Sequence, residues 1–170
     1  QLSFLFFEHE KKLDYDLLLP PQEFSLIFFF GEVRVSYPPI IFWDVDGTLT
    51  DGWYNSSSEK ELFKSFHTFD GIALQKISEQ GTLNCLVSAS FSNSIIEQRA
   101  KLLKVESLSA VKDKLKICQK FSEERGFNLR ECYFVGNDVN DLRIMNHVGR
   151  SFCPKDSDKT VIKQAEVLDV

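Results

Sequence analysis

The chain has 170 residues, 43% of them hydrophobic, and a formal net charge of −5 at pH 7. This length and hydrophobic content suffice for one globular domain with its own core. The negative charge argues against a general nucleic-acid-binding protein, because such proteins carry basic surfaces that neutralise phosphates. An anionic substrate would therefore need local positive charge or a bound metal ion.

The cysteines are widely spaced and include no Cys-x-x-Cys pair, so neither a zinc site nor a disulfide scaffold is indicated. No apolar run approaches the ~20 residues that cross a bilayer, and the ends show no signal-peptide pattern. We expect a cytoplasmic protein that binds neither membrane nor nucleic acid and keeps its thiols reduced in the core. These thiols belong to Cys85, Cys118, Cys132 and Cys153.

Residues 1–37 are expected to form an N-terminal extension, followed by a single domain over residues 38–170. Aromatic-rich apolar runs at residues 2–7 and 24–30 flank a charged stretch and a Pro-Pro pair. They fit two strands, an arm that packs on another subunit, or the remnant of an upstream domain. The chain begins at Gln1 rather than at Met, which fits a fragment or a processed protein.

The most informative stretch begins with the apolar residues 40–43, Ile-Ile-Phe-Trp, which lack alternation, as is typical of a strand buried on both faces. The run ends at Asp44, and Asp46 follows one residue later. Ligands bind at the carboxyl ends of strands in open α/β sheets, and Gly47 allows a sharp turn there. Two crowded carboxylates indicate a metal site, a nucleophile with its acid partner, or both. A plain turn is the alternative, since Asp and Gly favour turns.

Further along the chain, strands and helices alternate. This predicts an α/β fold: a Rossmann-like three-layer α/β/α sandwich around a central parallel sheet, without a large cap. Aromatic and polar residues mix over residues 53–66, which fits a projecting β-hairpin. Asp70 can cap the first helix, and Ser92 or Asn93 the second. Later strands are expected at residues 83–87, 105–110, 131–135 and 151–153.

Three of the expected strands end in polar clusters, at Asp44, Ser88 and Asn137, and in a parallel sheet these clusters meet at one edge. Hydrolysis of a phosphate monoester needs a nucleophile, positive charge over the phosphoryl oxygens, and a proton for the leaving alcohol. Asp44 can supply the nucleophile and Asp46 the proton. Mg²⁺ prefers oxygen ligands, which Asp44, the Asp46 carbonyl and Asn137 can provide.

Other residues are candidates for binding the substrate. The Ser88 hydroxyl can donate to a phosphoryl oxygen, although a serine at a strand end is often a local cap. Lys114 can neutralise phosphate oxygens, although lysines on a helix often form a solvated face. His67, Asp70 and Gly71 are candidate substrate contacts. The alternative is that His67 is a turn residue and Asp70 a helix cap, with Gly71 as its neighbour.

The stretch from Asp44 to Gly52 resembles the signature of the haloacid dehalogenase superfamily of phosphatases, in which the first Asp attacks phosphorus and the second is the general acid/base. With Phe-His-Thr-Phe-Asp-Gly at residues 66–71 and Gly-Asn-Asp-Val-Asn-Asp-Leu at residues 136–142, it looks like the capless branch typified by 3-deoxy-D-manno-octulosonate 8-phosphate phosphatase. The resemblance covers about residues 40–168. It implies a Mg²⁺-dependent phosphatase for a phosphorylated 2-keto-3-deoxy sugar acid, acting through an aspartyl-phosphate. It also implies a homotetramer in which the hairpin helps to cover a neighbour's site.

This chain departs from the octulosonate phosphatases at two motifs. It has Ser-Ala-Ser at residues 88–90 instead of Thr-Gly-Arg, and Gly-Asn-Asp at residues 136–138 instead of Gly-Asp-Asp. Both departures resemble the C-terminal domain of sialic acid cytidylyltransferases, which has the same fold. We expect a substrate of the 3-deoxy-octulosonate 8-phosphate type or of the nonulosonate (sialic acid) 9-phosphate type. The alternative is a weakly active or inactive oligomerisation domain of a sialic acid cytidylyltransferase.

Overall fold

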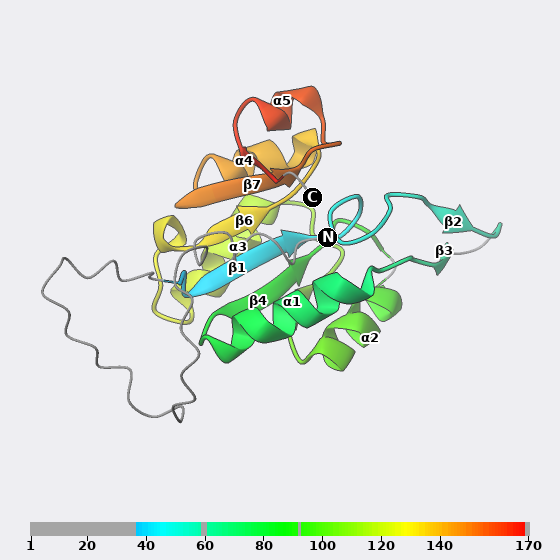
Figure 1. The fold of residues 1–170 in the computed structure, drawn as a ribbon, viewed down its shortest axis with the longest axis horizontal. Helices are drawn as coiled ribbons and strands as arrows, with labels where there is room; N and C mark the ends of the chain where they lie inside the picture. The colour runs from blue at the N-terminus through cyan, green and yellow to red at the C-terminus, as the bar shows by residue number, and fades with distance from the viewer. Residues whose placement is uncertain (1–36, 59–60, 92, 169–170) are drawn as a thin grey trace, which may run out of the picture.

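The computed structural model describes residues 37–58, 61–91 and 93–168. Its centre is a six-stranded, entirely parallel sheet in the order β5-β4-β1-β6-β7-β8 (Figure 1). The expectations for residues 1–36 and for a cap at Ser92 lie outside the described residues. The strands are β1 (Ile40–Asp44), β4 (Leu83–Val87), β5 (Glu106–Leu108), β6 (Tyr133–Val135), β7 (Arg150–Pro154) and β8 (Glu166–Leu168).

Strand β1 lies at the centre of the sheet, between β4 and β6. All five of its residues are buried, because helices cover both faces of the sheet. Ile40 and Phe42 pack into one apolar cluster, whereas Ile41 and Trp43 pack into the other. This two-sided burial explains why the strand reads as an unbroken apolar run.

Each face of the sheet has its own helical layer, so the expected three-layer α/β/α sandwich is confirmed. Leu74 and Ile96 belong to the cluster that holds Trp43, whereas Cys118 and Val161 belong to the cluster that holds Phe42. The first layer contains α1 (Thr68–Glu79) and α2 (Asn93–Leu103), and the second contains α3 (Lys114–Glu123), α4 (Leu142–Met145) and α5 (Lys159–Ile162). Two short 3-10 helices, η3 (Leu129–Glu131) and η4 (Val139–Asp141), precede β6 and α4.

A β-hairpin separates β1 from α1, as expected. It pairs β2 (Asn55–Ser56) with β3 (Glu61–Phe63) in antiparallel fashion, and a bridge between Thr50 and Phe66 closes its base. Figure 1 shows it projecting away from the sandwich. Among the described residues between β1 and α1, no further helix or strand forms, in agreement with a fold that lacks a large cap.

The structure corrects two details of the sequence prediction. Helix α1 is capped by His67, whose Nδ1 accepts a hydrogen bond from Phe69 N at 3.2 Å, whereas Asp70 lies buried in the first turn. Helix α5 and strand β8 were not predicted. Both are too short to show a period, and β8 is specified by its pairing with β7. No helix in the described ranges is long and apolar enough to span a membrane.

Candidate active site

The site is built at the carboxyl edge of the three central strands. Asp44 is the last residue of β1, Ser88 follows β4, and Asn137 follows β6. Asp46 links them, because Ser88 Oγ donates to Asp46 Oδ2 at 2.9 Å and the Asn137 amide faces the Asp46 carbonyl. The topology therefore brings together four of the residues that were singled out from the sequence.

Asp44 is buried and bound to a buried lysine. Lys114 Nζ, from the first residue of α3, lies 2.5 Å from Asp44 Oδ1 and 2.6 Å from Asp141 Oδ1. Burial raises the pKa of Asp44 to about 7; Lys114 opposes this shift, and Asp141 adds to it. Burial disfavours the charged form of Lys114, but the two carboxylates outweigh it and raise the pKa of Lys114. The lysine is therefore a fixed positive charge beside the candidate nucleophile.

Asp141 is a site residue to which the sequence analysis assigned no role. Its side chain is fully buried, and Oδ2 accepts from the backbone nitrogens of Asn137 at 3.1 Å and of Asp138 at 3.3 Å. Any Cβ at Gly136 would lie 2.5 Å from this oxygen, which is why the position has no side chain. Asp141 thus fixes the turn that presents Asn137. Its four-residue spacing from Asn137 was the available signal.

Lys64 was also missed. It follows β3 of the hairpin, and its Nζ lies 2.5 Å from Asp46 Oδ1 and 2.8 Å from Glu61 Oε1. Burial disfavours its charge, but hydrogen bonds to these two carboxylates raise the pKa of Lys64 above its ordinary value. The local sequence pattern does not distinguish this lysine, because lysine is common in surface hairpins. Its burial depends on the approach of Asp46, which is a tertiary contact.

The Asn137 amide lies next to the carboxylate of Asp44 and the main-chain carbonyl of Asp46. The atom that it presents to the site is 3.0 Å from Asp44 Oδ2, 3.1 Å from the Asp46 carbonyl oxygen and 3.2 Å from Thr48 Oγ. If that atom is nitrogen, it donates to all three. If it is oxygen, its distances from Asp44 Oδ2 and the Asp46 carbonyl oxygen resemble those between neighbouring ligands of Mg²⁺. Two adjacent oxygen ligands of an octahedral Mg²⁺ ion lie about 2.8–3.0 Å apart when each metal–oxygen distance is about 2.0–2.1 Å.

With the amide oxygen turned toward the site, Asp44, the Asp46 carbonyl and Asn137 could together supply three oxygen ligands, a donor set that suits Mg²⁺. The described residues contain no cluster of three or more His, Cys, Asp and Glu side chains that could hold a metal. Two of the three candidate ligands are instead an amide and a main-chain carbonyl. Gly47 serves the same geometry, because its φ of +86° turns the chain and any Cβ there would collide with the Asn137 side chain.

Three other sequence candidates lie around the start of α1. His67, Asp70 and Gly71 line a small cavity together with Phe66 and Arg99. His67 is exposed and caps the helix, and any Cβ on Gly71 would lie 2.8 Å from Arg99 Nη2. The structure thus places these three residues together around one cavity, which neither Asp44 nor Asp46 lines.

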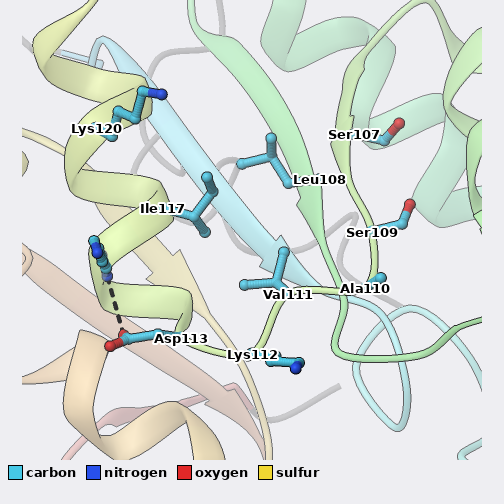
Figure 2. Close-up of a pocket in the computed structure, with 10 residues that line it drawn as sticks. Ser107, Leu108, Ser109, Ala110, Val111, Lys112, Asp113, Ile117 and Lys120 are labelled. Atoms are coloured by element: carbon cyan, nitrogen blue, oxygen red, sulfur yellow. Dashed lines mark hydrogen bonds between the residues drawn. The ribbon is translucent and has the colours of Figure 1, made fainter.

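A hollow of about 590 Å³ lies beside the site, between the loop after β5 and helix α3 (Figure 2). Asp113 caps α3 there by accepting from Lys116 N at 3.1 Å. Lys114 extends from the same turn toward Asp44 and does not line the hollow. Cavity size alone would therefore not have located the acidic cluster. The hollow has an apolar floor of Leu108, Val111 and Ile117 and a rim of Lys112, Lys116 and Lys120.

The fold and the family to which the sequence belongs define a class of hydrolase. The family model described as haloacid dehalogenase-like hydrolase matches residues 53–168, more than half of the chain. The chain therefore belongs to this family of enzymes. The matched range begins after Asp46, so the assignment is independent of the two aspartates.

Known proteins similar to this chain fall into two groups. It is 27% identical over 115 residues to 3-deoxy-D-manno-octulosonate 8-phosphate phosphatase of Haemophilus influenzae, a match that covers 67% of this chain and 63% of that protein. It is 24% identical over 153 residues to N-acylneuraminate cytidylyltransferase A of Danio rerio, covering 88% of this chain and 36% of that protein. The chain thus spans between about a third and two thirds of these relatives.

Solved structures share the fold. The cobalt-bound Haemophilus influenzae octulosonate phosphatase superposes with a TM-score of 0.75 at 25% identity, over 79% of both chains. The Moraxella catarrhalis enzyme, solved with magnesium, phosphate and the sugar acid KDO, has a TM-score of 0.74 at 24% identity, over 78% of this chain and 77% of that one. This second similarity concerns the fold alone.

Proposed function

We propose that this chain is a Mg²⁺-dependent phosphatase that hydrolyses a phosphorylated 2-keto-3-deoxy sugar acid through an aspartyl-phosphate. The observation that carries the proposal is the environment of Asp44. One carboxylate oxygen is held by Lys114 and the other faces Asn137, at the carboxyl end of the central strand. A carboxylate held between a fixed cation and a candidate metal position is suited to attack an anionic phosphorus centre.

In the first step Asp44 attacks phosphorus, a new oxygen–phosphorus bond forms, and the ester bond to the sugar breaks. Asp46 gives its proton to the departing sugar oxygen. In the second step Asp46 takes a proton from water, which attacks the aspartyl-phosphate and releases phosphate. Lys114 neutralises charge on the phosphoryl oxygens, and the Ser88 hydroxyl donates to one of them when Asp46 is protonated on Oδ2. A Mg²⁺ ion bound by Asp44, the Asp46 carbonyl and Asn137 would supply further positive charge for the anionic substrate.

The substrate we propose is of the 3-deoxy-octulosonate 8-phosphate or nonulosonate (sialic acid) 9-phosphate type. The support comes from the relatives, one named for the octulosonate 8-phosphate and the other for N-acylneuraminate. His67, Asp70 and Gly71, at the start of α1, are the proposed contacts for the sugar acid. The absence of the family's arginine at Ser90 favours a substrate other than the octulosonate phosphate itself.

We also propose that residues 38–170 form the phosphatase domain, that it acts in the cytoplasm, and that it assembles as a homotetramer through the hairpin. The four cysteines are buried free thiols, which suits a reducing compartment. On the hairpin, Trp53 is 76% exposed and Phe63 54% exposed. Such apolar surface favours burial against another subunit.

A phosphate-release screen tests the proposal. Sugar-acid phosphates of eight and nine carbons are supplied to the purified protein with magnesium or with a chelator. Turnover should require magnesium and vanish in Asp44→Asn, which removes the nucleophilic oxygen but keeps the shape. Turnover that persists in Asp44→Asn would show that this mechanism is wrong.

The second candidate is an oligomerisation domain of a sialic acid cytidylyltransferase with weak or no activity. The match to the Danio rerio enzyme, which covers 88% of this chain, favours it. The two candidates differ in the screen: an oligomerisation domain would release little or no phosphate from any of the substrates and would still assemble.

A further inference from the structure

The hairpin contributes a charged side chain to the acidic cluster as well as an exposed apolar surface. Lys64 stands at the end of β3, and its side chain is only 2% exposed. Its ammonium lies between two carboxylates, that of Glu61 on the same hairpin and that of Asp46 in the loop after β1. A lysine is rarely buried to this degree without a partner that requires it.

Glu61 anchors this lysine. Its side chain is fully buried, and Oε1 binds Lys64 at 2.8 Å. Its other oxygen, Oε2, is buried without a hydrogen-bond partner among the described residues. A buried carboxylate with an unsatisfied oxygen costs folding free energy. This cost argues that the Glu61–Lys64 pair serves the interaction that the ammonium makes with Asp46.

On the side away from Glu61, Lys64 holds the Asp46 carboxylate in one orientation. Asp46 Oδ1 binds Lys64 at 2.5 Å, and Asp46 Oδ2 accepts from Ser88 Oγ at 2.9 Å. The Asp46 side chain is 41% exposed, so burial alone does not fix its rotamer. The two donors come from different elements, the hairpin and the loop after β4.

We propose that Lys64, anchored by Glu61, is a positioning residue that fixes the Asp46 carboxyl group for proton transfer to the leaving group. In the acid form that the first step needs, the proton is on Oδ2, which faces Ser88, while Oδ1 keeps the hydrogen bond from Lys64. The inference rests on the proposed phosphatase function, in which Asp46 protonates the departing oxygen. A loosely held proton donor loses much of its effect, because proton transfer requires hydrogen-bond distance and alignment. The hairpin is then part of the catalytic machinery as well as an assembly surface.

The test compares two substrates that differ in their need for a proton donor. A sugar-acid phosphate, here a nonulosonate (sialic acid) 9-phosphate, releases a strongly basic alkoxide, whereas p-nitrophenyl phosphate releases a weakly basic phenolate. The variants are Lys64→Met, the double variant Lys64→Met with Glu61→Gln, which leaves no buried carboxylate unpaired, and Lys64→Arg. The control is Lys116→Met, an exposed lysine outside the cluster.

Both Lys64→Met variants should lower kcat/KM more for the sugar-acid phosphate than for p-nitrophenyl phosphate, by a further factor of about 10 or more. This factor is a fraction of the roughly 10²–10⁴-fold rate effect that a positioned general acid provides. Lys64→Arg should restore most of the difference, and Lys116→Met should change neither substrate. Equal losses with both substrates, or no loss, would overturn the inference.

A second readout does not depend on activity. In crystal structures, the Asp46 carboxylate should leave its orientation toward Ser88 in the double variant and keep it in Lys64→Arg. An unchanged Asp46 in the double variant would refute the positioning role, even if the protein hydrolysed no phosphate. A wild-type protein that hydrolyses neither substrate would refute the proposed function separately.

Discussion

Lys114 Nζ binds Asp44 Oδ1 at 2.5 Å across 70 residues of sequence, and Asp141 shares the same ammonium at 2.6 Å. The three side chains are almost fully buried. One positive charge therefore balances two carboxylates at the end of the central strand. Removing the lysine would leave both acids without a partner cation, which links the stability of the fold to the chemistry of the site.

We predict that Lys114→Met lowers the free energy of unfolding of the metal-free protein by about 3–5 kcal/mol at neutral pH, because it breaks a buried ion pair. Phosphate release should also fall to background. Urea unfolding in the presence of a chelator gives the stability. Lys112→Met, an exposed lysine two residues away, is the control and should lie within about 0.5 kcal/mol of wild type. Equal stabilities for the two variants would contradict the prediction.

A pH dependence follows from the raised pKa of Asp44. Between the ordinary aspartate pKa of 3.8 and about 7, the folded protein retains a proton that the unfolded chain has released. The metal-free protein should therefore lose stability as pH rises through this window, by up to roughly 1.4 kcal/mol per pH unit from this group, and level off above it. Thermal or urea unfolding of wild type and Asp44→Asn, compared from pH 4 to 8, isolates the effect. Parallel stability curves for the two proteins would disprove it.

The sequence predicted the fold where one local pattern determined the structure. The apolar run before Asp44 required a strand buried on both faces, and the alternation of elements required a parallel sheet. The helix cap was misplaced by three residues, because both His67 and Asp70 are able to accept from backbone nitrogens. The three-residue strand β8 has no pattern of its own, since its register comes from pairing with β7.

The site was predicted less completely than the fold, because several of its contacts depend on tertiary structure and not on a local sequence pattern. Asp44, Asp46 and Asn137 each end or follow a recognisable strand, so strand order alone brings them together. Lys64 reaches Asp46 across 18 residues, through a hairpin whose approach no local pattern encodes. Asp141 lay within a recognised motif, but its role in holding the Asn137 turn depends on a tertiary contact with Lys114.

The exposed apolar surface of the hairpin leads to a prediction about assembly. The double variant Trp53→Gln with Phe63→Gln should shift a homotetramer toward smaller species, because it removes apolar area that an interface would bury. Leu102→Gln, on α2 and 68% exposed, is the control and should keep the wild-type mass. Light scattering at micromolar concentration measures both. A monomeric wild-type protein, or an unchanged mass in the double variant, would contradict hairpin-mediated assembly.

The final prediction separates the roles of Asn137 and Asp138 in binding magnesium. The Asn137 amide lies 3.0 Å from Asp44 Oδ2, whereas the exposed Asp138 carboxylate accepts from Val139 N at 2.6 Å as the cap of η4. An amide oxygen is an uncharged ligand, so Asn137→Asp adds a negative charge at the proposed metal position. The magnesium concentration for half-maximal activity should then fall by ~10-fold, if the charge contributes about 1.4 kcal/mol.

Asp138→Asn serves as the matched variant. It should change the magnesium requirement less, because its side chain acts through the helix cap and through the orientation of the turn. Magnesium titrations of phosphate release, with isothermal calorimetry of magnesium binding as a readout independent of turnover, compare both variants with wild type. If Asp138→Asn abolishes the metal dependence while Asn137→Asp leaves it unchanged, the two residues exchange roles: Asp138 is then the direct ligand, and the amide of Asn137 donates to Asp44.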